Sequence, residues 1–82
     1  MAEDQLDLIV KLAEEVLGRK LSANEKLELR AKFLSETGDP AEKAKNAIKS
    51  KFLISESTWI QKKASTDDID RIIRDIIQGK GK

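Results

Sequence analysis

The stretch 39-DPAEKAKNAIKSKFLISESTWIQKK-63 contains the only proline of the chain, two of its three aromatic residues and six of its lysines. Asp39 and Pro40 predict a helix start, because an aspartate N-cap accepts hydrogen bonds from free amide groups and proline suits the first helical position. Glu42 completes a capping-box pattern. We therefore expect a helix over 40–53.

This helix has an apolar and a polar face when its residues are spaced at about 100° each. The apolar face carries Ala41, Ala44, Ile48 and Phe52. The opposite arc carries Lys43, Lys45, Asn46, Lys49 and Ser50. Residues 41–63 contain six lysines against two glutamates, a surplus of four positive charges. One side of the helix is therefore expected to pack, and the other to face water or a charged partner.

The apolar pattern loses its phase after Phe52, and Ser55 begins a run of new N-cap candidates. We predict a break there, followed by a short helix over 56–63. One continuous helix is the alternative, because Ile48, Phe52 and Trp59 remain in register. We expect Trp59 to anchor the core, and its use as a stacking platform for a nucleic-acid base is the alternative.

On the N-terminal side, the sequence predicts a helix over 3–17. Its apolar residues cover a wide arc, which predicts packing on more than one side; they are Leu6, Leu8, Ile9, Val10, Leu12, Ala13, Val16 and Leu17. Gly18 suits the left-handed conformation that ends many helices. A second capping box, Ser22 with Glu25, predicts a further helix over 23–37.

We expect Gly38 to end this second helix, which has two apolar stripes. The residues of the first stripe, which we expect to face inward, are Ala23, Leu27, Ala31 and Leu34. Leu29 and Phe33 lie on a separate line. A helix with two stripes either packs between two neighbours or leaves one stripe for a partner. We favour packing within the domain, with a partner-binding stripe of Leu29 and Phe33 as the alternative.

The last predicted helix covers 66–78. Ser65 or Thr66 is placed to cap it, acidic residues fill its first turn, and Gly79 is placed to stop it. Its apolar arc consists of Ile69, Ile72, Ile73, Ile76 and Ile77. We expect this seam to dock on the helix over 3–17, and a dimer seam is the alternative because the spacing also fits heptad core positions.

The chain as a whole predicts an all-α fold. It has 82 residues, 39% hydrophobic and 38% charged, and no segment alternates with the period of a strand. We therefore expect residues 1–82 to form one compact single-domain bundle of four to five short helices, with the first and last helices supplying most of the core.

The composition argues against catalysis. The chain has no cysteine and no histidine, which excludes disulfides, thiolate chemistry and imidazole acid–base chemistry. The acidic cluster Asp67, Asp68 and Asp70 lacks the glycine and the distal glutamate of a calcium loop. We expect no catalytic residue, no cofactor, no metal and no enzymatic activity. With no apolar run near the ~20 residues of a membrane span, we expect a cytoplasmic protein without a membrane partner.

A binding module remains, and its first candidate ligand is duplex DNA. The two helices on either side of Gly38 resemble a helix-turn-helix motif. Lysine binds phosphates, and asparagine can pair with adenine. The candidate nucleic-acid-binding residues are Lys43, Lys45, Asn46, Lys49, Ser50, Lys62 and Lys63. Such a module would serve as a small regulator or as a domain of a replication protein.

The alternative function is protein–protein interaction or homodimerisation. Its candidate surfaces are the Leu29 and Phe33 stripe and any exposed part of the Ile-rich seam. The two functions differ in salt sensitivity, because charge-driven DNA binding weakens steeply with salt and apolar association does not.

Overall fold

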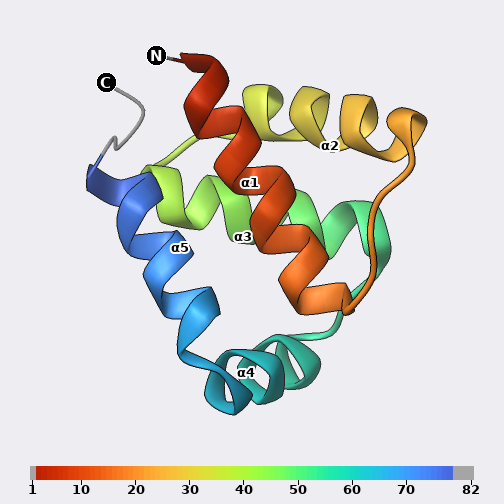
Figure 1. The fold of residues 1–82 in the computed structure, drawn as a ribbon. Coiled ribbons are helices and arrows are strands. Elements are labelled where there is room, and N and C mark those ends of the chain that lie inside the picture. The colour runs from red at the N-terminus through yellow and green to blue at the C-terminus, as the bar shows by residue number, and fades with distance from the viewer. Residues whose placement is uncertain (1, 79–82) are drawn as a thin grey trace.

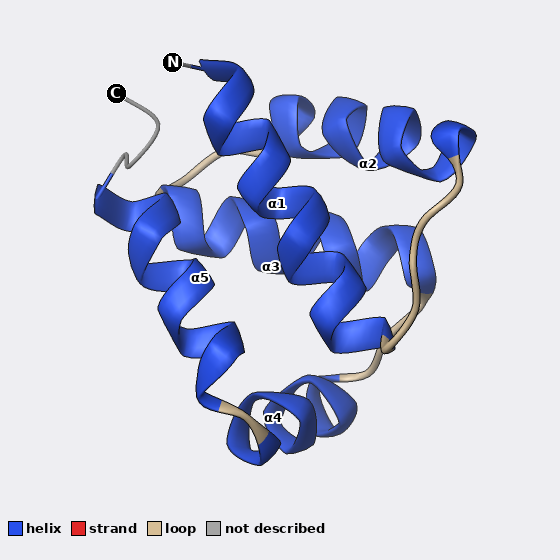
Figure 2. Cartoon of the chain, in the orientation of Figure 1, coloured by secondary structure: helices blue, strands red, loops and turns tan. Residues whose placement is uncertain are grey.

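The computed structural model describes residues 2–78, which form five helices without a strand (Figures 1 and 2). The helices are α1 (Ala2–Leu17), α2 (Ala23–Ser35), α3 (Pro40–Phe52), α4 (Glu56–Ser65) and α5 (Asp67–Gln78). The prediction of a compact all-α bundle is confirmed. Within residues 2–78, no helix combines the length and the apolar character that crossing a membrane requires.

Helix α1 runs through the middle of the view in Figure 1, in front of α3. It packs against α5, α2 and α4, which agrees with the wide apolar arc of its sequence. The contact between α1 and α5 is the most extensive in the molecule. The buried core residues are Ile9, Val10, Leu12, Ala13, Val16, Leu21, Leu29, Phe33, Ala44, Ala47, Ile48, Trp59, Ile69 and Ile76.

The Ile-rich seam of α5 docks inside the molecule. Ile69 and Ile76 are fully covered, and Ile72 and Ile73 are packed against the core with partial exposure. Ile77 is 56% exposed. The Thr66 hydroxyl accepts a hydrogen bond from the Asp68 N–H at 3.1 Å, as a cap at the start of α5 should. The expected stop at Gly79 lies outside the described residues.

The predicted N-caps of α2 and α3 are present, and the predicted capping box is found at α2, whereas α3 has the bond to Asp39 alone. The Ser22 hydroxyl accepts from the Glu25 N–H at 3.2 Å, and the Glu25 carboxylate accepts from the Ser22 N–H at 2.9 Å. These two bonds form the capping box. At the start of α3, the Asp39 carboxylate accepts from the Glu42 N–H at 3.0 Å, with Pro40 as the first helical residue.

The end of α2 differs from the prediction. The helix ends at Ser35 because Glu36 is extended, and the Glu36 N–H donates back to the carbonyls of Lys32 and Phe33. Gly38 has a φ of 108° but lies in the loop beyond this end. The glycine therefore shapes the α2–α3 connection and does not stop the helix.

The chain breaks between α3 and α4. Leu53 adopts the left-handed conformation with a φ of 55°, and its N–H and that of Ile54 both donate to the Lys49 carbonyl. Ser55 then caps α4 by accepting from the Thr58 N–H at 3.2 Å. The continuous helix is thus excluded. Trp59 is buried, so its ring is not available as a stacking platform.

Candidate interaction surface

One apolar stripe of α2 is buried and the other is exposed, and the exposed stripe is the one that was expected to face inward. Leu29 is 0% exposed and Phe33 is 2% exposed, whereas Leu27 is 62% and Leu34 is 66% exposed. Ala31, between these two leucines, is also exposed. The expected inward face of α2 is therefore its outer face. Leu29 and Phe33 belong to the core and do not form a partner-binding stripe on the surface of this monomer.

Charged contacts on both flanks of α2 accompany this orientation. Arg30 pairs with Asp7 of α1 at 3.4 Å, and Glu28 pairs with Lys51 of α3. These charged residues lie on opposite sides of Leu29, so both pairs fit an orientation in which Leu29 faces the core. The ammonium group of Lys43 lies over the Phe33 ring, 4.5 Å from the ring centroid.

Helices α2 and α3 form an antiparallel pair (Figure 1). The contact between Phe33 and Lys43 lies near the connecting loop, and the contact between Glu28 and Lys51 lies far from it. Contacts at both ends keep the helices side by side along their length, as in an αα-hairpin. A helix-turn-helix pair instead crosses at a large angle, which lets its second helix project into a groove.

Most of the candidate nucleic-acid-binding lysines contact other residues of the same chain. Lys45 and Lys49 both bind the Glu56 carboxylate, with 3.0 Å from the Lys45 Nζ to Oε2. Hydrogen bonds from Lys49 and then Lys45 lower the pKa of Glu56. Lys63 lies 3.7 Å from Asp70.

The remaining candidates are open to solvent. Asn46 and Ser50 are exposed on α3, and Lys62 is exposed on α4. The structure therefore gathers Lys45 and Lys49 at the α3–α4 corner, whereas Lys43 lies over Phe33 and Lys63 lies near α5. The predicted set does not form one continuous face.

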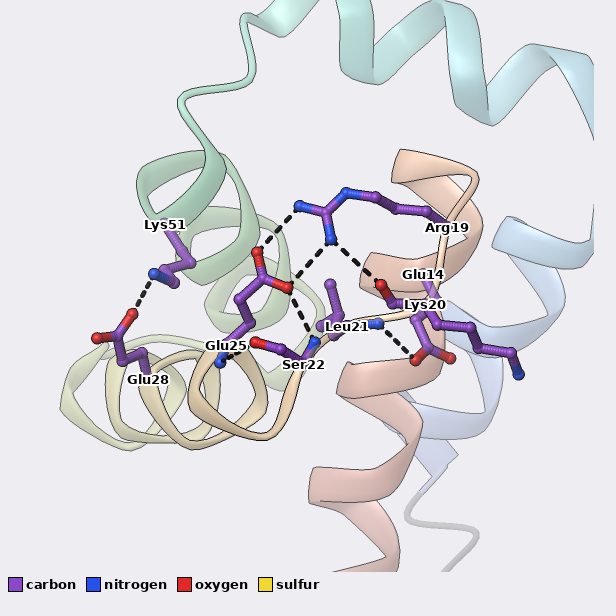
Figure 3. A network of polar contacts seen from close by, with 8 residues as sticks. All are labelled: Glu14, Arg19, Lys20, Leu21, Ser22, Glu25, Glu28 and Lys51. Carbon is purple, nitrogen blue, oxygen red and sulfur yellow. Dashed lines mark hydrogen bonds and ion pairs between the residues drawn. The ribbon is translucent and has the colours of Figure 1, made fainter.

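A polar network fixes the corner between α1 and α2 (Figure 3). The Arg19 guanidinium donates two hydrogen bonds of 3.0 Å to the Glu25 carboxylate, and the Leu21 N–H donates to Glu14 at 3.1 Å. The hydrogen bond from Arg19, followed by that from the Ser22 backbone, lowers the pKa of Glu25 to about 2. The sequence indicated the capping box, but the pattern did not predict that Arg19 and Glu14 join it.

Among the residues that the structure describes, no group of three or more acidic side chains is arranged to hold a metal ion. The hollow between α1 and α5 is lined largely by charged groups such as Lys11, Glu15 and Arg71.

Comparison with family models, curated proteins and solved structures found no match to this chain. Its function is therefore argued from the surfaces described above. The apolar outer face of α2 and the lysine-rich α3–α4 corner are the two candidates.

Proposed function

We propose that the protein is a non-enzymatic interaction module that binds a protein partner through the outer stripe of α2, defined as Leu27, Ala31 and Leu34. The observation that carries this proposal is the exposure of both leucines on one face of one helix. Their spacing of four and three residues through Ala31 places them in line along the helix.

The arrangement of these leucines matters more than their number. Single exposed apolar residues are common on soluble proteins and need no explanation. Two leucines aligned with an alanine form a stripe that a partner helix can cover in one contact. Fully burying an exposed leucine contributes about 1.5–3 kcal/mol, and about two thirds of each leucine is exposed, so covering each one contributes about 1–2 kcal/mol.

The stripe is also held rigidly. Leu29 and Phe33 anchor α2 to the core, while the pairs of Arg30 with Asp7 and Glu28 with Lys51 attach both flanks to neighbouring helices. A partner would meet a preformed surface, so little ordering of α2 opposes binding.

Site-specific photo-crosslinking in the source cells tests the proposal. A photoreactive amino acid at position 27 or 34 should give adducts with protein, because both positions lie in the proposed contact. The same amino acid at position 77 is the matched control, since Ile77 is comparably exposed on α5. Equal adduct patterns at 27 and 77, or none at 27 and 34, would contradict the proposal.

Nucleic-acid binding is a second candidate, and one observation favours it. Lys45 and Lys49 share the single carboxylate of Glu56, so this corner retains a net positive charge beside exposed Asn46 and Ser50. Exposed ion pairs contribute only about 0–1 kcal/mol, and phosphate groups can therefore compete for these lysines.

A salt-dependent titration with duplex DNA tests the second candidate. Each phosphate contact makes the slope of log affinity against log salt more negative by roughly 0.9, so replacing Lys45 and Lys49 by Gln should reduce the magnitude of the slope by about two. Asn46→Ala should relax sequence preference without changing the slope. Absence of binding at low salt would reject DNA as the ligand.

A further inference from the structure

We infer that the connection between α3 and α4 is a hinge through which two copies of the chain exchange α4 and α5. In the exchanged dimer, α3 and α4 of each copy form one continuous helix, and the α4–α5 segment of each copy packs on the other. The outer stripe of α2 takes no part in this exchange, so the dimer is independent of the proposed function. Its partner is a second copy of this chain.

The hinge, residues 53–55, has an unfavourable backbone conformation in the monomer. Leu53 has a φ of 55° and a ψ of 47°, and among the described residues 2–78 it is the only one besides glycine with a positive φ. A Cβ atom makes this left-handed conformation unfavourable. The Leu53 side chain is 90% exposed, so its burial does not offset the strain. The monomer therefore stores strain at the point where α3 gives way to α4.

The sequence around the hinge also suits a continuous helix. Residues 48–59, IKSKFLISESTW, contain neither glycine nor proline. Four residues of this segment lie on one line at helical spacing; they are Ile48, Phe52, Ser55 and Trp59. Straightening would release the strain at Leu53 and replace the Ser55 cap of α4 by ordinary helical hydrogen bonds. The helix is therefore a second conformation that the hinge can adopt.

A straightened hinge carries α4 and α5 away from the rest of their own chain. The contact between α1 and α5 is the most extensive in the molecule, and α5 also packs on α3. Ile69 and Ile76, which are 1% and 0% exposed in the monomer, would lose much of their cover. Exposure of this apolar surface to water is unfavourable, so an open chain is not stable alone. A second open copy offers the same surfaces, and exchange restores these contacts.

The exchange also brings two exposed apolar residues near the hinge onto one face. Leu53 and Ile60 are 90% and 55% exposed in the monomer, where the break between α3 and α4 separates them. In a continuous helix they are seven residues apart, which places them on the same side. In the dimer, α3 of each copy ends beside α4 of the other, so the two hinges are neighbours. The continuous helices therefore cross at the hinge, which brings each Leu53 close to the other copy.

Sedimentation of hinge variants, refolded at low and at high concentration, tests the inference. Wild type should be a monomer at low concentration, with a dimer fraction that grows at high concentration. Ser55→Ala removes a cap that only the monomer uses, and should raise the association constant about tenfold. Leu53→Gly favours the left-handed hinge and disfavours a helix, and should lower this constant at least about tenfold. Ser22→Ala is the matched control, since the cap of α2 is the same in both states, and should leave it unchanged.

A crosslink between two chains tests the exchange itself. Lys11 of α1 and Asp75 of α5 line the hollow between these helices, and the chain has no cysteine of its own. Chains with Lys11→Cys and chains with Asp75→Cys are refolded together at high concentration. A short bis-maleimide should then link two chains, because α5 of one copy lies on α1 of the other. The double variant, kept dilute, should link only within one chain, which shows that the reagent spans the hollow.

Three results would overturn the inference. The first is a monomer at every concentration, for wild type and Ser55→Ala alike. The second is a dimer that Leu27→Gln removes and Leu53→Gly does not affect, which would place the contact on the outer stripe of α2. The third is a dimer that gives no linked pair of chains although the double variant links. A dimer that responds to the hinge variants and gives the two-chain product supports the exchange.

Discussion

The two sides of α2 have similar compositions but opposite environments. One side carries Leu29 and Phe33, which are buried, and the other carries Leu27 and Leu34, which are mostly exposed. Hydrophobicity alone does not separate them, since each side has two large apolar residues. The ion pairs of Arg30 and Glu28 lie on opposite flanks and fit this orientation, but exposed pairs contribute only about 0–1 kcal/mol each, so they do not determine it alone.

This difference shows what an apolar stripe on a small helix can mean. In a bundle of 82 residues, the area available for burial is limited, and five short helices cannot cover every apolar face of one another. A face left uncovered by the fold becomes a candidate contact surface. The following predictions test whether the two faces of α2 differ in this way.

The largest expected effect comes from the same substitution on each face. Leu29→Ala should lower the free energy of unfolding by about 2–5 kcal/mol, because it removes buried methyl groups and leaves a cavity. Leu27→Ala should change it by less than about 0.5 kcal/mol, as expected for an exposed position. Urea unfolding followed by circular dichroism measures both. Equal losses would mean that both faces contribute to the core.

A smaller change in the free energy of unfolding is expected at Leu53, the exposed leucine that ends α3. Leu53 is 90% exposed and has a left-handed backbone, which is unfavourable for a residue with a Cβ atom. Leu53→Gly should therefore raise the free energy of unfolding by about 0.5–1 kcal/mol.

Leu27→Gly is the matched control, since it places glycine inside a helix and should lower stability by about 1 kcal/mol. Thermal unfolding of both variants gives the signs directly. A loss of stability in Leu53→Gly would indicate that the Leu53 side chain makes a stabilising contact.

The smallest expected effect concerns the corner that starts α2. Because the pKa of Glu25 is lowered to about 2 from an ordinary value of 4.5, its contribution to stability is present above pH 4.5. That contribution is lost as the pH falls toward 2. Glu25→Gln should reduce the pH dependence of unfolding in this range, and Arg19→Gln should raise the pKa of Glu25. A wild-type Glu25 carboxyl that titrates near 4.5 by NMR would contradict this account.

Local sequence signals predicted the helices well. Capping residues such as Ser22, Asp39 and Ser55 make the hydrogen bonds that mark helix starts, and these depend only on neighbouring residues. The period of apolar residues in α1 and α5 also predicted their buried faces. The predicted end of α2 was wrong, because the extended backbone of Glu36 ends the helix before Gly38.

The candidate site was much less predictable, because it depends on contacts between residues far apart in the chain. The pairing of Glu28 with Lys51 and of Asp7 with Arg30 spans 23 residues in each case. The sequence near each residue does not indicate which distant residue it pairs with. The same holds for Lys45 and Lys49. Their position on the polar arc of α3 predicted a surface open to a partner, but both lysines contact Glu56.

The most direct test of the central claim is a map of amide chemical-shift changes when the labelled protein is titrated with a synthetic amphipathic helix that carries a leucine seam. The account predicts that the changes cluster in α2 around Leu27, Ala31 and Leu34. Changes concentrated at the α3–α4 corner, around Lys45, Lys49 and Glu56, would contradict it. That result would make the lysine-rich corner, and not the outer stripe of α2, the binding surface.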